Sequence, residues 1–332
     1  GTASGLVRGI GDDAAVFKTA VGSNTLVSTD LLIEDVDFRR ATTAPELLGH
    51  KALAVSLSDI AAMGGRPRWA LLSVGVPADV WESDFLDRFY QGYLRLAERY
   101  GVKLIGGDVS RTPEKIIIDS IVVGECPSGR EVLRSGAQPG DQVFVTGFLG
   151  DAAAGLRLIE RGARLHQPPT PDAPTVAPEN ERHPIDHLLL RQLRPEPRVG
   201  WGLLLGDQQL ATALIDISDG LSSDLNHLCN ESEVGALIDA AAIPIDPLVA
   251  ELCGRRALDP LLLALNGGED FELLFTVSPD KVAQLPSRVD GISLTRIGEI
   301  RVAAHGVRIS EGARTWQLDP GGWEHFKTKA AT

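Results

Sequence analysis

A long apolar segment, Thr43 to Gly65, constrains the fold of this 332-residue chain more than any other stretch. Its spacing predicts one helix, with Thr43 as N-cap, Glu46 completing a capping box, and Gly64 and Gly65 ending it. One stripe repeats every three or four residues: Leu48, Ala52, Val55, Asp59 and Ala62. A buried, unpaired carboxylate costs several kcal/mol, so Asp59 either meets a cation or strong donors or is a capping or surface residue.

The composition allows two domains with sizeable cores, because 43% of the residues are hydrophobic. The net charge of −13 argues against a nucleic acid as partner. No apolar run is long enough to span a bilayer, which argues against a membrane partner. The scattered cysteines, Cys126, Cys229 and Cys253, form no CxxC motif and predict a reduced, cytoplasmic protein.

Five acidic sites share one pattern, in which a strand or a glycine turn delivers carboxylates. They are Asp12/Asp13, Asp30, Asp108, Asp216/Asp219 and Glu269/Asp270, and the predicted helix adds Asp59. If these sites converge, their hard oxygen atoms select Mg²⁺ or Ca²⁺. Taken singly, each can also be an ordinary polar turn, and Asp219 can be a helix N-cap.

Several magnesium ions beside glycine loops would suit a polyphosphate substrate. The chain has no GxxxxGK[ST] loop and no protein-kinase motif set. Phosphoryl transfer needs mainly positioning and charge neutralisation, so an acid-rich site fits that reaction. Gly147 and Gly150 precede a predicted helix whose N-terminus could receive a phosphate, or which is simply a strand–helix junction.

A proline-rich stretch at about 166–184 predicts a surface insertion, because its prolines exclude a helix or a central strand. His166, His183 and His187 flank or follow it, but nothing in the sequence fixes them as a metal site. Pro139-Gly140 marks a predicted boundary between an N-terminal domain, 1–138, and a C-terminal domain, 139–332.

Eight motifs in this order resemble the thiamine-monophosphate kinase family: GIGDDAA, STD at 28–30, KALAVSLSDIAAMG, LIGGD, RSGAQPGD, DISDGLSSDL, GGEDFELLF and GWEHF. The resemblance implies an α/β (α+β) fold of two domains like that of aminoimidazole ribonucleotide synthetase. It also implies a homodimer formed through the N-terminal sheets. The implied reaction is ATP-dependent phosphorylation of thiamine monophosphate to thiamine diphosphate, in the cytoplasm, with several Mg²⁺ ions.

The same resemblance implies roles for individual residues. Metal positions would be Asp13, Ser28, Thr29, Asp30, Asp59, Asp108, Asp216 and Asp219. ATP contacts would be Gly107, Asp108, Arg134 and Ser218, and the catalytic set would be Asp59, Asp216 and Arg134. Substrate contacts would be Asp37, Glu269 and Trp323. Asp37 departs from the family, which more often has histidine there, and its charge beside a phosphate would need another cation.

Two alternatives stay open at this point. The chain could be another ATP-using enzyme of the same fold, such as aminoimidazole ribonucleotide synthetase or selenophosphate synthetase, although no cysteine near the N-terminus supports the latter. It could also be a non-catalytic scaffold that binds a magnesium nucleotide. Trp323 likewise has two interpretations: it stacks on an aromatic ring of the substrate, or it anchors the tail to the core.

Overall fold

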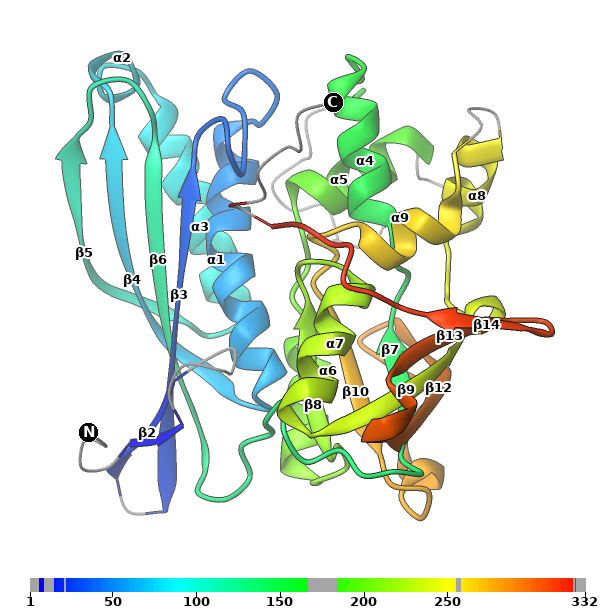
Figure 1. The fold of residues 1–332 in the computed structure, drawn as a ribbon. Coiled ribbons are helices and arrows are strands. Elements are labelled where there is room, and N and C mark those ends of the chain that lie inside the picture. Colours follow the sequence, from blue (N-terminus) through cyan, green and yellow to red (C-terminus); the bar gives the residue numbers. More distant parts are fainter. Residues whose placement is uncertain are drawn as a thin grey trace.

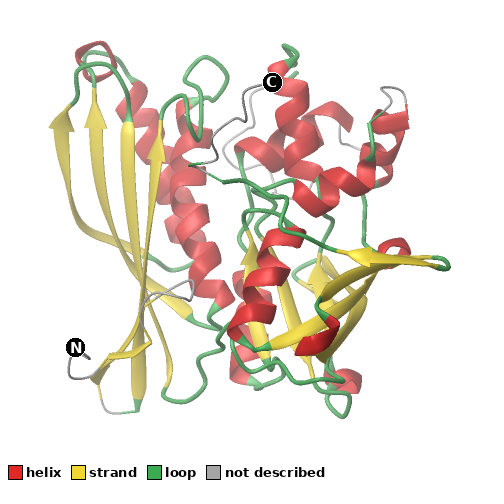
Figure 2. Cartoon of the chain, viewed as in Figure 1, coloured by secondary structure: helices red, strands yellow, loops and turns green. Residues whose placement is uncertain are grey.

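Two β-sheets, with helices between and above them, form the part of the chain that the structure describes (Figures 1 and 2). The structure is a computed structural model and describes residues 6–8, 15–20, 22–166, 184–254, 258–324 and 326. Asp12, Asp13 and most of the predicted proline-rich insertion lie outside the described residues. The division at 138/139 stays a prediction.

The first sheet lies on the left in Figure 1, and its strand order is β1-β2-β3-β6-β4-β5 among the described residues. Its strands are β1 (Leu6–Arg8), β2 (Ala15–Ala20), β3 (Ser23–Ile33), β4 (Arg66–Val76), β5 (Lys103–Arg111) and β6 (Ile117–Pro127). Neighbouring strands are antiparallel except β4 and β5, which are parallel. A parallel pair needs a crossover connection, and α2 (Ala78–Trp81) and α3 (Phe85–Arg99) supply it.

Helices α1 (Pro45–Ala62) and α3 cover one face of this sheet. Phe89, Tyr93 and Leu96 form the apolar face of α3 and are buried in the N-terminal core. The two helices cross at a pair of glycines. A Cβ on Gly49 would lie 1.9 Å from the Phe89 carbonyl oxygen, and a Cβ on Gly92 would lie 1.9 Å from the Glu46 carbonyl oxygen. Larger residues at either position would therefore push the helices apart.

The predicted start of α1 is wrong in detail. Ala44 is its N-cap and makes no side-chain cap, while Glu46 forms an ion pair with Arg88 at 2.7 Å instead of a capping box. The helix is also not amphipathic. Every residue from Leu47 to Ala62 is buried except Asp59, because α1 lies between the two halves of the molecule.

The second sheet has the order β14-β13-β9-β12-β7-β10-β8, and β11 pairs with β12. Its strands are β7 (Gln142–Thr146), β8 (Ala213–Ile217), β9 (Val234–Asp239), β10 (Glu272–Val277), β11 (Arg288–Val289), β12 (Ile292–Val302), β13 (Val307–Glu311) and β14 (Arg314–Gln317). The helices around it are α4 (Asp151–Glu160), α5 (Pro184–Leu193), α6 (Val199–Asp207), α7 (Leu221–Glu231), α8 (Pro247–Gly254) and α9 (Pro260–Asn266), with short 3₁₀ helices at 240–242, 282–284 and 303–305. Figure 1 shows α4, α5, α8 and α9 gathered above the sheet, where they form a separate apolar cluster.

Two of the predicted acidic sites lie at neither a strand end nor a glycine turn. The strand that carries Asp30 continues to Ile33, and the strand that carries Asp108 continues as β5 to Arg111. Both acids therefore lie within strands, where neighbouring strands fix the face on which they sit. Among the described residues, no helix combines the length and apolar character that a membrane span requires.

Candidate functional site

Helix α1 joins the two halves of the molecule through consecutive polar residues near its end. Ser28 on β3 donates a hydrogen bond to Asp59 Oδ2. The preceding residue, Ser58, donates to Asp216 Oδ2 on β8 at 2.6 Å. We call this region, made by Ser28, Asp30, Ser58, Asp59 and Asp216, the seam. Residues predicted as metal positions from three different motifs thus meet there.

Asp59 differs from its predicted position in one respect. The prediction placed it on a buried stripe, and the other stripe residues are buried as expected. Asp59 itself is only partly buried, so its carboxylate is accessible while a serine hydroxyl orients it. Asp30 lies two residues beyond Ser28 on β3, so both side chains share the face that packs against α1.

Backbone hydrogen bonds join three segments that are distant in sequence but lie next to Asp216. The amide of Glu269 donates to the Ser218 carbonyl at 2.8 Å, and the amide of Trp323 donates to the Asp219 carbonyl at 3.0 Å. The amide of Gly322 donates to Ser223 Oγ at 3.1 Å. The predicted substrate residues Glu269 and Trp323 therefore adjoin the loop that carries the predicted metal position Asp219.

Asp219 is not the N-cap of α7. Gly220 occupies that position, and the Asp224 carboxylate accepts hydrogen bonds from the amides of Asp219, at 3.2 Å, and Gly220, at 3.0 Å. Asp224, in the first turn of the helix, thus binds the two backbone amides that precede it. The interpretation of Asp219 as the N-cap is wrong, because Asp219 precedes that position, and its side chain is partly buried.

Two other predicted residues, Thr29 and Asp108, lie on the opposite face of the first sheet. Thr29 is exposed and donates to Asp119 Oδ1 at 2.6 Å. Asp108 pairs with Ser73 between the buried residues of β4, so it shares the face that points away from α1. Gly107 precedes it with φ +152°, and a Cβ there would lie 1.9 Å from the Leu72 carbonyl oxygen. Since β5 is three strands away from β3, Asp108 is about 14 Å across the sheet from Asp30.

Arg134 and Asp37 have distinct surroundings. The backbone before Arg134 runs along the seam: the Val132 amide donates to the Met63 carbonyl at 3.1 Å, and the Leu133 carbonyl accepts from the Leu214 amide at 2.9 Å. Arg134 is therefore partly buried beside the strand that carries Asp216. Asp37 lies in the turn after β3, where its Oδ2 accepts the Ile33 amide at 2.8 Å. Its observed role is to close that turn.

A second acidic group, which the sequence did not reveal, surrounds Glu272. Its carboxylate is fully buried and accepts Arg198 Nε at 2.5 Å, Arg191 at 2.7 Å and the Thr146 hydroxyl at 2.7 Å. Burial raises the pKa of Glu272, but the two guanidinium groups and the hydroxyl outweigh it, and the net direction is downward. Gly147 must be glycine here, since its φ is +58° and a Cβ would lie 2.2 Å from Glu272 Oε1.

The Asp270 side chain caps the N-terminus of α4. Its carboxylate accepts the amides of Gly150 at 2.6 Å and Ala152 at 3.0 Å. Burial raises its pKa to about 6, although Arg191 and the two amides act in the opposite direction. The interpretation of this N-terminus as a phosphate site is therefore wrong, because a carboxylate of the protein already occupies it. The strand–helix junction is the correct interpretation.

His187 lies between two acids near the same helix. Its Nε2 is 3.3 Å from Asp246 Oδ2 and 3.8 Å from Asp151 Oδ2. These three side chains are close enough to share a metal ion. However, the Arg191 guanidinium lies 3.5 Å from the same Asp151 oxygen, so a cation already faces this group. His166 pairs instead with Asp186 at 2.9 Å, and His183 lies outside the described residues.

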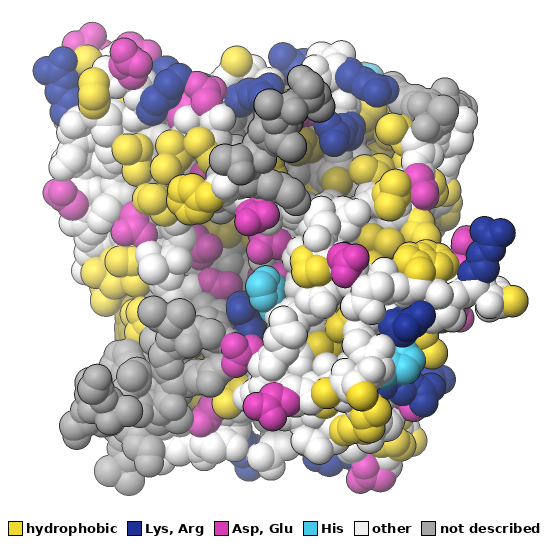
Figure 3. All heavy atoms as spheres, viewed as in Figure 1, with side chains coloured by type: hydrophobic (Ala, Val, Ile, Leu, Met, Phe, Trp, Pro, Cys, Tyr) yellow, Lys and Arg dark blue, Asp and Glu magenta, His cyan; other side chains and the backbone are white. Residues whose placement is uncertain are grey.

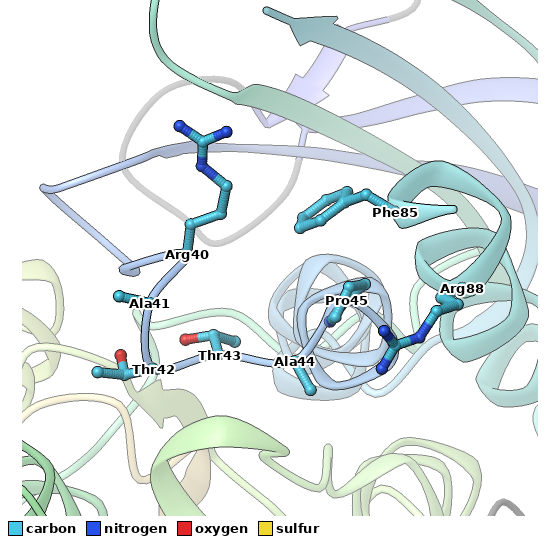
Figure 4. A pocket seen from close by; sticks show the side chains of 8 residues that line it. All are labelled: Arg40, Ala41, Thr42, Thr43, Ala44, Pro45, Phe85 and Arg88. Carbon is cyan, nitrogen blue, oxygen red and sulfur yellow. The ribbon is translucent and has the colours of Figure 1, made fainter. Parts of the chain in front are cut away.

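A pocket of about 460 Å³ lies elsewhere, at the start of α1 (Figure 4). Arg40 and Arg88 stand on its two sides, with Phe85 between them. Each arginine already binds carboxylates: Arg40 binds Glu34 and Asp79, and Arg88 binds Glu46. None of the predicted site residues lines this pocket. The space-filling view instead shows acidic side chains gathered along the middle of the face, between the two halves (Figure 3).

Comparison with known proteins defines first the class and then the family. Residues 11–126 match the N-terminal domain of AIR synthase related proteins, and residues 138–309 match their C-terminal domain. The predicted α/β two-domain fold is thereby confirmed. Over 96% of its length the chain is 38% identical to thiamine-monophosphate kinases of Bacillus subtilis (strain 168) and Escherichia coli (strain K12), and it covers 93% and 92% of those proteins.

A solved structure of AaThiL complexed with AMPPCP and TMP superimposes with a TM-score of 0.80 at 35% identity, covering 96% of this chain and 92% of that one. The chain belongs to the thiamine-monophosphate kinase family. The resemblance drawn from the eight motifs is confirmed, and the roles of the individual residues stay predictions.

Proposed function

We propose that this protein transfers the γ-phosphoryl group of ATP to thiamine monophosphate, producing thiamine diphosphate and ADP. One observation carries the proposal: Ser28 binds Asp59, the neighbouring Ser58 binds Asp216, and the Glu269 amide bonds to Ser218, two residues beyond Asp216. Family membership supports it, because the similar AaThiL structure holds AMPPCP, an ATP analogue, together with TMP. A phosphoryl donor and acceptor bound together are what direct transfer requires.

The chemistry asks little of the side chains as acids or bases. The phosphate of the acceptor is largely dianionic near pH 7, because its second pKa is about 6. One of its oxygens forms the new bond to the γ-phosphorus, while the bond from that phosphorus to the bridging oxygen of ADP breaks. The barrier is then mainly repulsion between anions. We assign Arg134 to offset this negative charge directly, and Asp59 and Asp216 to position the metal ions that offset it.

The residues at the seam fit magnesium. Carboxylate and hydroxyl oxygens are the donors that Mg²⁺ prefers, and the seam with its adjoining loop offers Ser28, Asp30, Asp59, Asp216 and Asp219. We propose that these residues, with Asp13, hold several Mg²⁺ ions. When bound, the ions would supply the positive charge that phosphoryl transfer between two anions needs.

The other predicted contacts complete the proposal. Ser218, Arg134, Gly107 and Asp108 would contact ATP. Thr29 and Asp108 face away from the seam, so a metal position that they form would be separate from the seam. Glu269 and Trp323 would contact thiamine monophosphate. Asp37 would do so while its Oδ2 also accepts the Ile33 amide.

The open face of the first sheet supports a homodimer. Large apolar side chains on this face are exposed: Leu31, Trp69, Ile105 and Ile117. Exposed apolar side chains gathered on one face of a sheet suit an interaction site. A dimer through this face would place Thr29 and Asp108 at the interface. The three free, buried cysteines fit the proposed reducing, cytoplasmic compartment.

One assay tests the proposed reaction. The protein is incubated with Mg²⁺, ATP and thiamine monophosphate, and thiamine diphosphate and ADP are quantified. We expect both products in equal amounts, and loss of both in excess chelator. ATP hydrolysis without thiamine diphosphate, or full activity in chelator, would contradict the proposal. Binding of a magnesium nucleotide without any turnover would favour the scaffold alternative.

A further inference from the structure

Glu269 adopts a backbone conformation that its surroundings must maintain. Its φ is +67°, and Phe271 two residues later has φ +50°, in the left-handed region that few non-glycine residues occupy. The Glu269 amide bonds to Ser218, and a Cβ on Gly268 would lie 2.7 Å from the Ser218 carbonyl oxygen. The main chain of the loop is thus fixed against the Ser218–Asp219 loop. Side-chain contacts must set the direction of the carboxylate.

Two buried groups from different helices bind that carboxylate. Lys51 Nζ on α1 lies 2.6 Å from Glu269 Oε1, and Gln192 Nε2 on α5 donates to Oε2. The Lys51 side chain is 3% exposed, whereas the Glu269 side chain is 29% exposed. A ligand in this region would therefore meet Glu269 and not Lys51. A buried lysine needs its counter-ion, so the pair also depends on Glu269.

We propose that Lys51 is a positioning residue for the thiamine monophosphate site and acts by holding the Glu269 carboxylate, with Gln192 as the second contact. This inference rests on the proposed function. Each carboxylate oxygen has lone pairs beyond the one that Lys51 or Gln192 uses. The open side of Glu269 thus suits the amino group of a pyrimidine or a cationic thiazolium, which are the two groups that thiamine monophosphate offers.

The same helix also orients the metal end of the site. Lys51 and Ser58 are seven residues apart on α1, two turns, and so lie on one side of the helix. Ser58 holds Asp216, and Lys51 holds Glu269. Lys51 and Ser58 are about 10 Å apart along the axis of α1. The helix therefore fixes the spacing between the Glu269 carboxylate and the acids of the seam.

The test compares the substrates separately. Lys51→Met should raise the KM for thiamine monophosphate about tenfold or more, because a hydrogen bond to a charged group is lost, while the KM for ATP changes less than about twofold. Lys51→Arg should recover part of the loss. The double variant Lys51→Met with Glu269→Gln should be no worse than Glu269→Gln alone, because Lys51 acts only through Glu269. Lys281→Met, which removes a lysine that binds the Gln209 carbonyl at 2.7 Å, is the matched control.

A second variant keeps the test decisive if Lys51→Met does not fold. Gln192→Leu removes the other contact without removing a charge and should raise the KM for thiamine monophosphate severalfold, again without affecting ATP. Equal increases in both KM values, or additive losses in the double variant, would overturn the inference while leaving the proposed function intact. A wild-type protein that makes no thiamine diphosphate would overturn the proposed function itself.

Discussion

Two acidic groups of the molecule have different partners, although Glu269, near the first group, is only three residues from Glu272 in the second. In the first group, Ser28 and Ser58 bind Asp59 and Asp216. In the second group, Arg191 and Arg198 bind Glu272 in full burial. A guanidinium offsets the charge of a carboxylate, whereas a hydroxyl orients the carboxylate and leaves its charge in place. The partners therefore distinguish acids that stabilise the fold from acids that are suited to binding cations.

Lys51 gives Glu269 an intermediate character. Like Glu272, it has a buried cation as partner, but more than a quarter of its side chain stays exposed. It can contribute to the fold and still meet a ligand. The following predictions test this division, beginning with the largest expected effect.

The arginine-bound group should matter mainly for stability. Glu272→Gln leaves two buried guanidinium groups without their carboxylate and should lower the free energy of unfolding by about 3–5 kcal/mol. Chemical denaturation measures this change. Glu160→Gln is the control, because it removes an exposed pair with Arg157 and should cost less than about 1 kcal/mol. A stable Glu272→Gln protein with impaired turnover would contradict the division.

The seam should matter mainly for activity. Asp59→Asn keeps the shape but removes the charge, so kcat should fall about 100-fold or more while the melting temperature changes by only a few degrees. Asp87→Asn, at an exposed position on α3, is the matched control. Normal kcat in the Asp59 variant would show that this residue is structural.

His50, a buried residue on α1, makes the stability of the protein depend on pH. His50 binds the Pro195 carbonyl at 2.8 Å, and burial lowers its pKa from 6.5 to about 4. The unfolded chain therefore takes up a proton near pH 6.5 that the folded chain accepts only near pH 4. The free energy of unfolding is therefore unaffected by His50 above pH 6.5 and decreases as the pH falls from 6.5 toward 4.

His50→Gln removes this loss. Between pH 7 and pH 5, the variant should lose about 2 kcal/mol less unfolding free energy than the wild type. Chemical denaturation at the two pH values gives the difference. Exposed His227→Gln should behave like the wild type. An unchanged pH dependence in His50→Gln would show that another group dominates this range.

The smallest effect concerns Trp323, whose side chain is 57% exposed although its amide is tied to Asp219. If it stacks on the substrate, Trp323→Ala loses about 0.5–1.5 kcal/mol, which raises the KM for thiamine monophosphate a few-fold. The KM for ATP should not change, and Trp323→Phe should recover part of the loss. Trp316→Ala on β14 is the control. Lower thermal stability without kinetic selectivity would indicate a tail anchor.

The sequence predicted the fold class and the family well, because both depend on local patterns. The long helix α1 follows directly from such a pattern. The sequence did not distinguish Asp59 from Glu272, since the partner that defines each role is distant in the chain. Ser28 is 31 residues from Asp59, and Arg198 is 74 residues from Glu272.

Other errors have the same origin. The sequence placed Asp30 and Asp108 at a strand or glycine turn that delivers carboxylates, because aspartate and glycine usually interrupt strands, but pairing with β6 and β4 continues both strands. Lys51 looked like one polar residue in an apolar helix. The only local signal was that a lysine in such a buried position requires a counter-ion.

The most direct test of the account is the number of Mn²⁺ ions that the protein binds with AMPPCP, measured by electron paramagnetic resonance. Mn²⁺ serves as a probe for Mg²⁺ because both prefer oxygen ligands. Asp216→Asn, in the seam, should lose at least one ion relative to the wild type. Asp246→Asn, beside His187 and Asp151, should retain the full number. Loss of an ion in Asp246→Asn but not in Asp216→Asn would contradict the assignment of the metal ions to the seam.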